Sequence, residues 1–166
     1  MGKQTTTNTN IVDIDLSAIR KKRFRIDGDD NRILELNTSD LNILPRLKET
    51  YPKLMELNNQ VAELSVNASE VDEGDGFENG EFDNVIDTLA KVDASMREMI
   101  DYIFDSNVSE VCAPSGSMYD PIDGQCRFEH IIGCLTNLYE TDMSAEVAKL
   151  SKRTDKYTSK YTKRKK

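Results

Sequence analysis

Residues 80–105 read GEFDNVIDTLAKVDASMREMIDYIFD, and this stretch decides the fold class. Its apolar side chains recur at alternating spacings of three and four residues, the pattern of a helix that packs along one face against another helix. Ile86 and Ile100 widen that face into a broad stripe. The members of this heptad seam are Phe82, Val85, Leu89, Val92, Met96, Met99 and Ile103. We expect the seam to bind a partner protein, and burial in the chain's own core is the alternative.

A β-hairpin is predicted on the N-terminal side of this helix. Short alternating apolar runs flank the turn sequence DGDDN at residues 27–31, and Asp-Gly is a favoured hairpin turn. The pattern pairs residues 22–27 with residues 32–36.

Between the hairpin and the seam, the sequence predicts two helices and a linker. The polar cluster at residues 38–40 is typical of a helix N-cap, and apolar residues follow it at helical spacing. Because proline lacks a backbone N–H and clashes with the preceding turn, Pro52 should divide this stretch into helices over about 40–50 and about 52–66. Residues 67–80 are acidic and Gly-rich, so we expect an acidic linker there.

On the C-terminal side of the seam, we expect a short helical turn, a loop and a last amphipathic helix. Asp105-Ser106 resembles a cap for a turn through residues 108–112. Proline and glycine signals then predict a loop over residues 114–125, and the last helix starts near Arg127.

These elements divide the chain into three parts. Residues 1–21 are expected to be a flexible N-terminal segment, because their first ten residues are polar and Thr-rich. Residues 22–143 form a mostly α domain that begins with the hairpin. Thr141-Asp142 is expected to interrupt the last helix, and residues 144–166 then form a basic C-terminal helix or tail.

The charge is divided unevenly along the chain. Residues 149–166 carry nine basic residues and one acid, a net +8, so the total of −8 leaves −16 on residues 1–148. Residues 54–90 contain ten acids and no Lys or Arg. An acidic body repels nucleic acid and anionic membranes, whereas the basic tail could attract either of them or the body itself.

Signals for catalysis or metal binding are weak. The chain has one histidine, lacks the Gly-x-Ser-x-Gly and phosphate-binding glycine patterns, and shows no distinctive pair of carboxylates. Cys126, His130 and Cys134, with Cys112 as a fourth ligand, are the best zinc candidates. However, on a continuous helix eight residues separate Cys126 from Cys134 by about 12 Å, too far for both thiolates to bind one ion unless Cys126 lies in the preceding loop. We expect no catalytic, cofactor or metal site.

The compartment follows from cysteine usage and hydropathy. The three cysteines lack CxxC spacing, which favours a reducing, cytoplasmic setting. No apolar run approaches the ~18 residues of a transmembrane helix, so we expect no membrane partner.

Two stretches resemble the tail assembly chaperones of long-tailed bacteriophages. Residues 96–140 run from a helix through Ile103-Phe104-Asp105-Ser106 into a short helix, a loop and a final amphipathic helix. Residues 24–44, FRIDGDDNRILELNTSDLNIL, resemble the start of such proteins. This chain has Asp-Ser-Asn at residues 105–107, where many members carry a Gly-rich element.

The resemblance implies a non-enzymatic protein that acts in the cytoplasm of a bacterial host. Such a protein coats the tape-measure protein and recruits tail tube subunits during tail assembly, and self-association into a homo-oligomer is compatible with that role. Two alternatives remain open. One is a structural virion protein of the tail or neck, and the other is a nucleic-acid-associated protein that uses the basic C-terminal tail.

Overall fold

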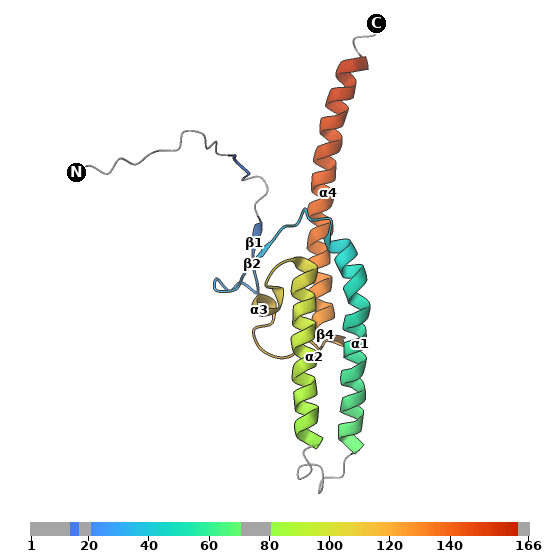
Figure 1. Ribbon diagram of the computed structural model, residues 1–166. Helices are drawn as coiled ribbons and strands as arrows, with labels where there is room; N and C mark the ends of the chain where they lie inside the picture. Colours follow the sequence, from blue (N-terminus) through green and yellow to red (C-terminus); the bar gives the residue numbers. More distant parts are fainter. Residues whose placement is uncertain (1–13, 17–20, 71–80, 163–166) are drawn as a thin grey trace, which may run out of the picture.

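The structure is a computed structural model that describes residues 14–16, 21–70 and 81–162. This part of the chain is mostly helical and contains two small antiparallel hairpins, one before the first long helix and one before the last (Figure 1). The elements are β1 (Lys22–Arg25), β2 (Ile33–Leu36), α1 (Ile43–Glu70), α2 (Glu81–Phe104), α3 (Val108–Cys112), β3 (Pro121–Ile122), β4 (Gln125–Cys126) and α4 (Arg127–Thr162). The mostly α fold with an N-terminal hairpin is therefore confirmed. The acidic linker predicted over residues 67–80 begins too early, because residues 67–70 are the last turn of α1. Residues 71–80 and most of the N-terminal segment expected to be flexible lie outside the described residues.

The predicted N-terminal hairpin is present. β1 and β2 pair antiparallel, with Phe24 opposite Leu34 and Arg23 opposite Glu35. Leu34 and Leu36 are fully buried while Glu35 between them is exposed, so one face of β2 covers the core. The hydroxyl of Ser106 donates to the carbonyl of Glu35 at 2.8 Å and ties the hairpin to the end of α2.

The prediction of two helices separated at Pro52 is wrong, because α1 continues from Ile43 to Glu70 with Pro52 inside it. Both Pro52 and Lys48, whose carbonyl would have accepted the missing N–H, are exposed. Solvent can therefore hydrate that carbonyl, and burial of Leu54 one half-turn later offsets the cost of the proline.

α2 confirms the helix predicted over residues 80–105, and its end organises the next element. Asp105 adopts a left-handed φ of 49°, and the N–H of Ser106 returns to the carbonyl of Asp101 at 3.2 Å, a common helix C-terminus. The Asp101 carboxylate accepts the backbone N–H of Ser109 at 2.7 Å and its hydroxyl at 2.8 Å. The side chain that caps α3 is therefore Asp101 of α2. The prediction that Asp105-Ser106 forms this cap is wrong.

The predicted loop between α3 and α4 contains a second hairpin. β3 and β4 pair with Ile122 opposite Gln125 around the two-residue turn Asp123-Gly124. Both turn residues have positive φ values, 49° and 79°, as a type I′ turn requires. Each strand is only two residues long, too short to produce an alternating sequence pattern.

α4 is one helix of 36 residues, so the expected interruption at Thr141-Asp142 is wrong. The Thr141 hydroxyl donates to the carbonyl of Asn137 at 2.9 Å, within the helix. Asp142 pairs with Lys22 of β1 at 2.6 Å. Because both polar side chains find partners while the backbone stays helical, the basic C-terminal segment continues α4 as a helix through Thr162.

α4 is offset along the axis of the bundle relative to α1 and α2. It begins beside the middle of α1, where the Cys126 thiol donates to the Asn58 side-chain oxygen at 3.2 Å and the rings of Tyr51 and Phe128 lie 6.5 Å apart. It then runs past the first residue of α1, and its C-terminal half projects from the body (Figure 1).

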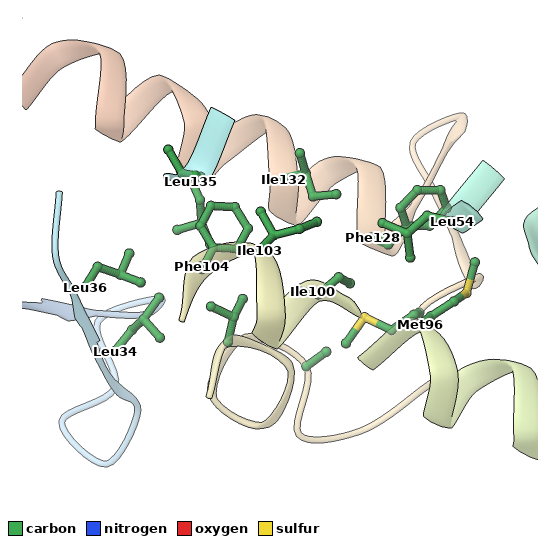
Figure 2. Packing of buried hydrophobic residues seen from close by; sticks show 14 of the residues in the cluster. Leu34, Leu36, Leu54, Met96, Ile100, Ile103, Phe104, Phe128, Ile132 and Leu135 are labelled. Carbon is green, nitrogen blue, oxygen red and sulfur yellow. The ribbon is translucent and has the colours of Figure 1, made fainter. Parts of the chain in front are cut away.

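The hydrophobic core fills the region where the three long helices overlap. Figure 2 shows Ile103 and Phe104 of α2 facing Ile132 and Leu135 of α4. Other labelled side chains lie at the two ends of this layer: Leu34 and Leu36 from β2 at one end, and Leu54, Met96 and Phe128 at the other.

Candidate functional site

The structure divides the heptad seam into two parts. Its C-terminal members are buried in the core or packed against it: Val92, Met96, Met99 and Ile103. Among its N-terminal members, Val85 and Leu89 are half-buried and Phe82 is 45% exposed. The part of the heptad seam that a partner can reach is thus confined to the first half of α2. That this part binds a partner stays a prediction.

This accessible part of the seam lies where α1 and α2 extend beyond α4. Among the described side chains, the last buried one in α1 is Leu54 and the first in α2 is Val92. Beyond them, Val61 and Leu64 of α1 are only half-buried. We name α1 after Asn58 together with α2 before Val92 the two-helix end.

A second apolar surface lies where the start of α1 meets the middle of α4. This α1–α4 groove has a volume of about 730 Å³. It is lined by Ile43, Leu44 and Leu47 of α1 and by Thr136, Tyr139, Glu140, Met143, Ser144 and Val147 of α4. Ile43 and Tyr139 are buried and form its base, whereas Leu44 is 59% exposed and Val147 is 62% exposed. Exposed apolar side chains around a concave surface are typical of a site that binds a protein or ligand.

The offset of α4 explains why the groove is open. The buried face of α4 carries Ile132, Leu135 and Tyr139, and helical spacing continues it through Met143 to Val147. Because α1 begins at Ile43, no earlier helical turn of α1 is present to cover these last side chains. Apolar residues placed for helix packing therefore remain accessible at this point.

Tyr139, one of the residues that line the groove, carries a buried polar group. Its ring lies 6.0 Å from that of Phe104, and its hydroxyl is buried without a hydrogen-bond partner among the described residues. Removal from water disfavours the charged form and raises the pKa of Tyr139 to about 12. The hydroxyl is therefore neutral at physiological pH.

The surroundings of the groove are negatively charged. Glu140 is one of its lining residues, and Asp142 lies beside Met143 on α4. Lys22 donates to the Asp142 carboxylate at 2.6 Å, and this bond with a second one from Thr38 lowers the pKa of Asp142. The bond also holds β1 against α4 next to the groove.

The candidate zinc ligands do not converge. In residues 14–16, 21–70 and 81–162, no group of three or more His, Cys, Asp and Glu side chains is placed to hold a metal ion. Cys126 contacts Asn58, Cys134 is exposed, and burial raises the pKa of Cys112 to about 11. Among the helices that the structure describes, none has both the length and the apolar character needed to cross a membrane.

Sequence reasoning found the seam but missed the groove. Leu44 and Val147 appear in the sequence as members of separate helical patterns, and nothing local indicates that they meet. Comparison of the chain with protein-family models, curated proteins and solved structures found no match.

Proposed function

We propose that this chain is a non-enzymatic protein that binds an amphipathic helix, and that it serves as a tail assembly chaperone of a long-tailed bacteriophage. Its partner would be the tape-measure protein, the tail tube subunits or both, in the cytoplasm of the bacterial host. The α1–α4 groove is the observation that supports a binding role. The assignment to tail assembly rests on the resemblance of residues 24–44 and 96–140.

The groove matches the dimensions of a helical ligand. Tyr139 and Val147 are two helical turns apart on α4, about 12 Å, so a partner helix could insert side chains at two or three successive turns. Leu44 and Leu47 form the opposite wall. Helix-in-groove binding uses apolar anchors at spacings of three, four and seven residues, and a tape-measure protein rich in amphipathic helix would offer many.

Charge specifies the partner helix further. Residues 1–148 carry −16, and Glu140 lies in the groove itself. A helix with basic residues beside its apolar face would be attracted, and an acidic one repelled. The acidity of the body would also keep an assembly with a long apolar partner soluble.

Co-expression with the tape-measure protein of the same phage tests the binding role. We expect wild-type protein to keep the tape-measure protein soluble and to co-purify with it. The double variant Leu44→Asp, Val147→Asp should reduce the amount of co-purified tape-measure protein at least about tenfold, because two charges enter the apolar surface. Tyr102→Asp is the matched control, since Tyr102 is 52% exposed on α2 outside the groove. Equal recovery with all three proteins would reject the groove as the site.

Quantitative mass spectrometry tests the assignment to tail assembly. A chaperone should be abundant in infected lysate during assembly and absent from purified particles. Stoichiometric presence in particles would instead identify a structural virion protein.

A further inference from the structure

The offset of α4 leaves two incomplete places in the bundle. At the two-helix end, α1 and α2 pack on each other without a third helix, and the apolar side chains that the structure describes there are at best half-buried. At the opposite end, Ser144 and Val147 of α4 still line the groove with the start of α1, and beyond them α4 continues as a helix to Thr162 without α1 or α2 beside it (Figure 1). We name residues 144–162 the α4 extension. The two-helix end thus has no third helix packed on it, and the α4 extension beyond Val147 has no other helix packed on it.

The α4 extension has the sequence pattern of a packing helix. Positions 147, 150, 154, 157 and 161 follow one another at spacings of three and four residues and hold Val, Leu, Thr, Tyr and Tyr. This heptad register places them along one face of the helix. Every side chain described between Ser144 and Lys152 is exposed, including Val147. Val147, the member of this pattern whose exposure the structure describes, is therefore accessible to a partner surface.

The two-helix end offers the complementary apolar surface. Val61 and Leu64 of α1 and Val85 and Leu89 of α2 are half-buried, and Ile86 is 48% exposed. The segment of α1 from residue 59 to Glu70 is about 18 Å long, whereas the 19 residues of the α4 extension span about 28 Å. The α4 extension is therefore long enough to cover the whole two-helix end.

The charges of the two ends are opposite. Residues 54–90 contain ten acids and no Lys or Arg, and Glu63, Asp83 and Asp87 are exposed at the two-helix end. Residues 149–166 contain nine basic residues and one acid. Such an arrangement attracts the α4 extension to the two-helix end and repels two α4 extensions from each other.

The α4 extension cannot reach the two-helix end of its own chain. α4 starts beside Asn58 and runs away from the two-helix end as one unbroken helix, so the two ends are at opposite poles of the molecule (Figure 1). Only a second molecule can bring the complementary surfaces together.

We propose that copies of this chain associate head to tail, with the α4 extension of one copy packed as the third helix on the two-helix end of the next. The contact uses different surfaces on the two molecules, so it is heterologous and can propagate into an open chain of copies. It uses the accessible part of the heptad seam and shares Ser144 and Val147 with the α1–α4 groove. The inference is argued from the charges and the length of the α4 extension and not from what the groove binds.

A nucleic acid is the competing ligand for a basic helix. Phosphates would neutralise the lysines but would leave the exposed apolar side chain of Val147 without a packing partner. The net −16 of residues 1–148 would also oppose binding to a polyanion. The two-helix end of a second copy offers both acidic side chains for the lysines and apolar side chains for packing, so we favour it.

Sedimentation velocity of the full chain tests the proposal with two complementary variants. The basic-end variant carries Lys149→Gln, Lys152→Gln and Lys156→Gln. The acidic-end variant carries Glu63→Gln, Asp83→Asn and Asp87→Asn. Neutral replacements remove attraction at one end without creating a new charge pair. A control variant with Arg23→Gln, Lys48→Gln and Lys53→Gln removes three exposed cations elsewhere, and circular dichroism checks that all variants keep the wild-type helix content.

We expect wild type and control to self-associate at about 50 mM salt and to do so more weakly at about 500 mM. Each end variant alone should raise the apparent Kd about tenfold or more. Mixed one to one, they should form a heterodimer that does not grow, because one intact acidic end meets one intact basic end. The proposal is overturned if wild type stays monomeric, if the variants associate like the control, or if the mixture stays monomeric. Loss of DNA binding by the basic-end variant with unchanged self-association would assign the helix to nucleic acid instead.

Discussion

Asp93 and Arg97 lie one turn apart on α2 and form a 2.7 Å ion pair whose side chains are only 19% and 25% exposed. The other carboxylate oxygen of Asp93 accepts the backbone N–H of Met118 at 2.6 Å. Arg97 also donates to the carbonyls of Ala113 and Gly116, at 3.0 and 2.6 Å. The pair therefore fixes the irregular segment between α3 and β3 to the helix that carries the core.

Replacing this arginine should destabilise the fold measurably. In Arg97→Met, the aliphatic stem remains, but Asp93 loses the guanidinium paired with it and the carbonyls of Ala113 and Gly116 lose the donor that Arg97 supplies. We expect the free energy of unfolding to fall by about 2–4 kcal/mol in urea titration, because partly buried acceptors are left unpaired. Lys91→Met is the control, since Lys91 is exposed on the same helix. A loss below about 0.5 kcal/mol would contradict the structural role of the pair.

Tyr139 should tolerate loss of its hydroxyl. The oxygen is buried without a hydrogen-bond partner among the described residues, so Tyr139→Phe removes a desolvated polar atom and keeps the ring contact with Phe104. We expect the free energy of unfolding to stay unchanged or to rise by up to about 1 kcal/mol. Tyr102→Phe on the exposed side of α2 gives the baseline for a surface hydroxyl. A loss above about 1 kcal/mol would show that the Tyr139 hydroxyl is satisfied in solution.

The cysteines should differ in reactivity. Burial raises the pKa of Cys112 from 9.0 to about 11, so the thiolate fraction in the folded protein at pH 8 is on the order of one in a thousand. Cys134 is exposed. Iodoacetamide labelling at pH 8 with peptide mass spectrometry should therefore modify Cys134 at least about tenfold faster than Cys112.

The same pKa shift has a consequence for stability. The folded state holds the Cys112 thiol neutral, whereas the unfolded chain ionises it near pH 9.0. The contribution of the Cys112 thiol to the free energy of unfolding is fully present below pH 9 and is lost as the pH rises toward 11. Equal labelling rates for Cys112 in native protein and in urea would contradict its burial.

Sequence reasoning succeeded where the pattern was local and failed where packing overrode it. The spacing of the heptad seam predicted α2 closely, and Asp27-Gly28 predicted the first hairpin. Pro52 and Thr141-Asp142 are local breaking signals, but α1 buries Leu54 just beyond the proline and Asp142 pairs with a lysine 120 residues away. No local pattern contains that information.

The candidate sites follow the same division. Periodicity identifies the apolar face of each helix but not how far the helices slide past one another. The offset of α4 decides that Met96 is core, that Ile86 is accessible, and that Leu44 meets Val147 in a groove. The offset depends on contacts between distant segments, such as Tyr51 with Phe128, which the sequence does not reveal.

Charged substitutions along α2 should separate the core part of the heptad seam from its accessible part. Met96 is fully buried, so Met96→Asp places a charge in the core and should cost about 3–5 kcal/mol or prevent folding. Ile86 is 48% exposed on the same helix, so Ile86→Asp should cost less than about 1 kcal/mol. Urea titration followed by circular dichroism at 222 nm measures both, and Met96→Leu controls for the change of shape alone, with an expected loss below about 1.5 kcal/mol. Equal losses for the two aspartate variants would mean that the two-helix end is packed as tightly as the core and that α4 is not offset in solution.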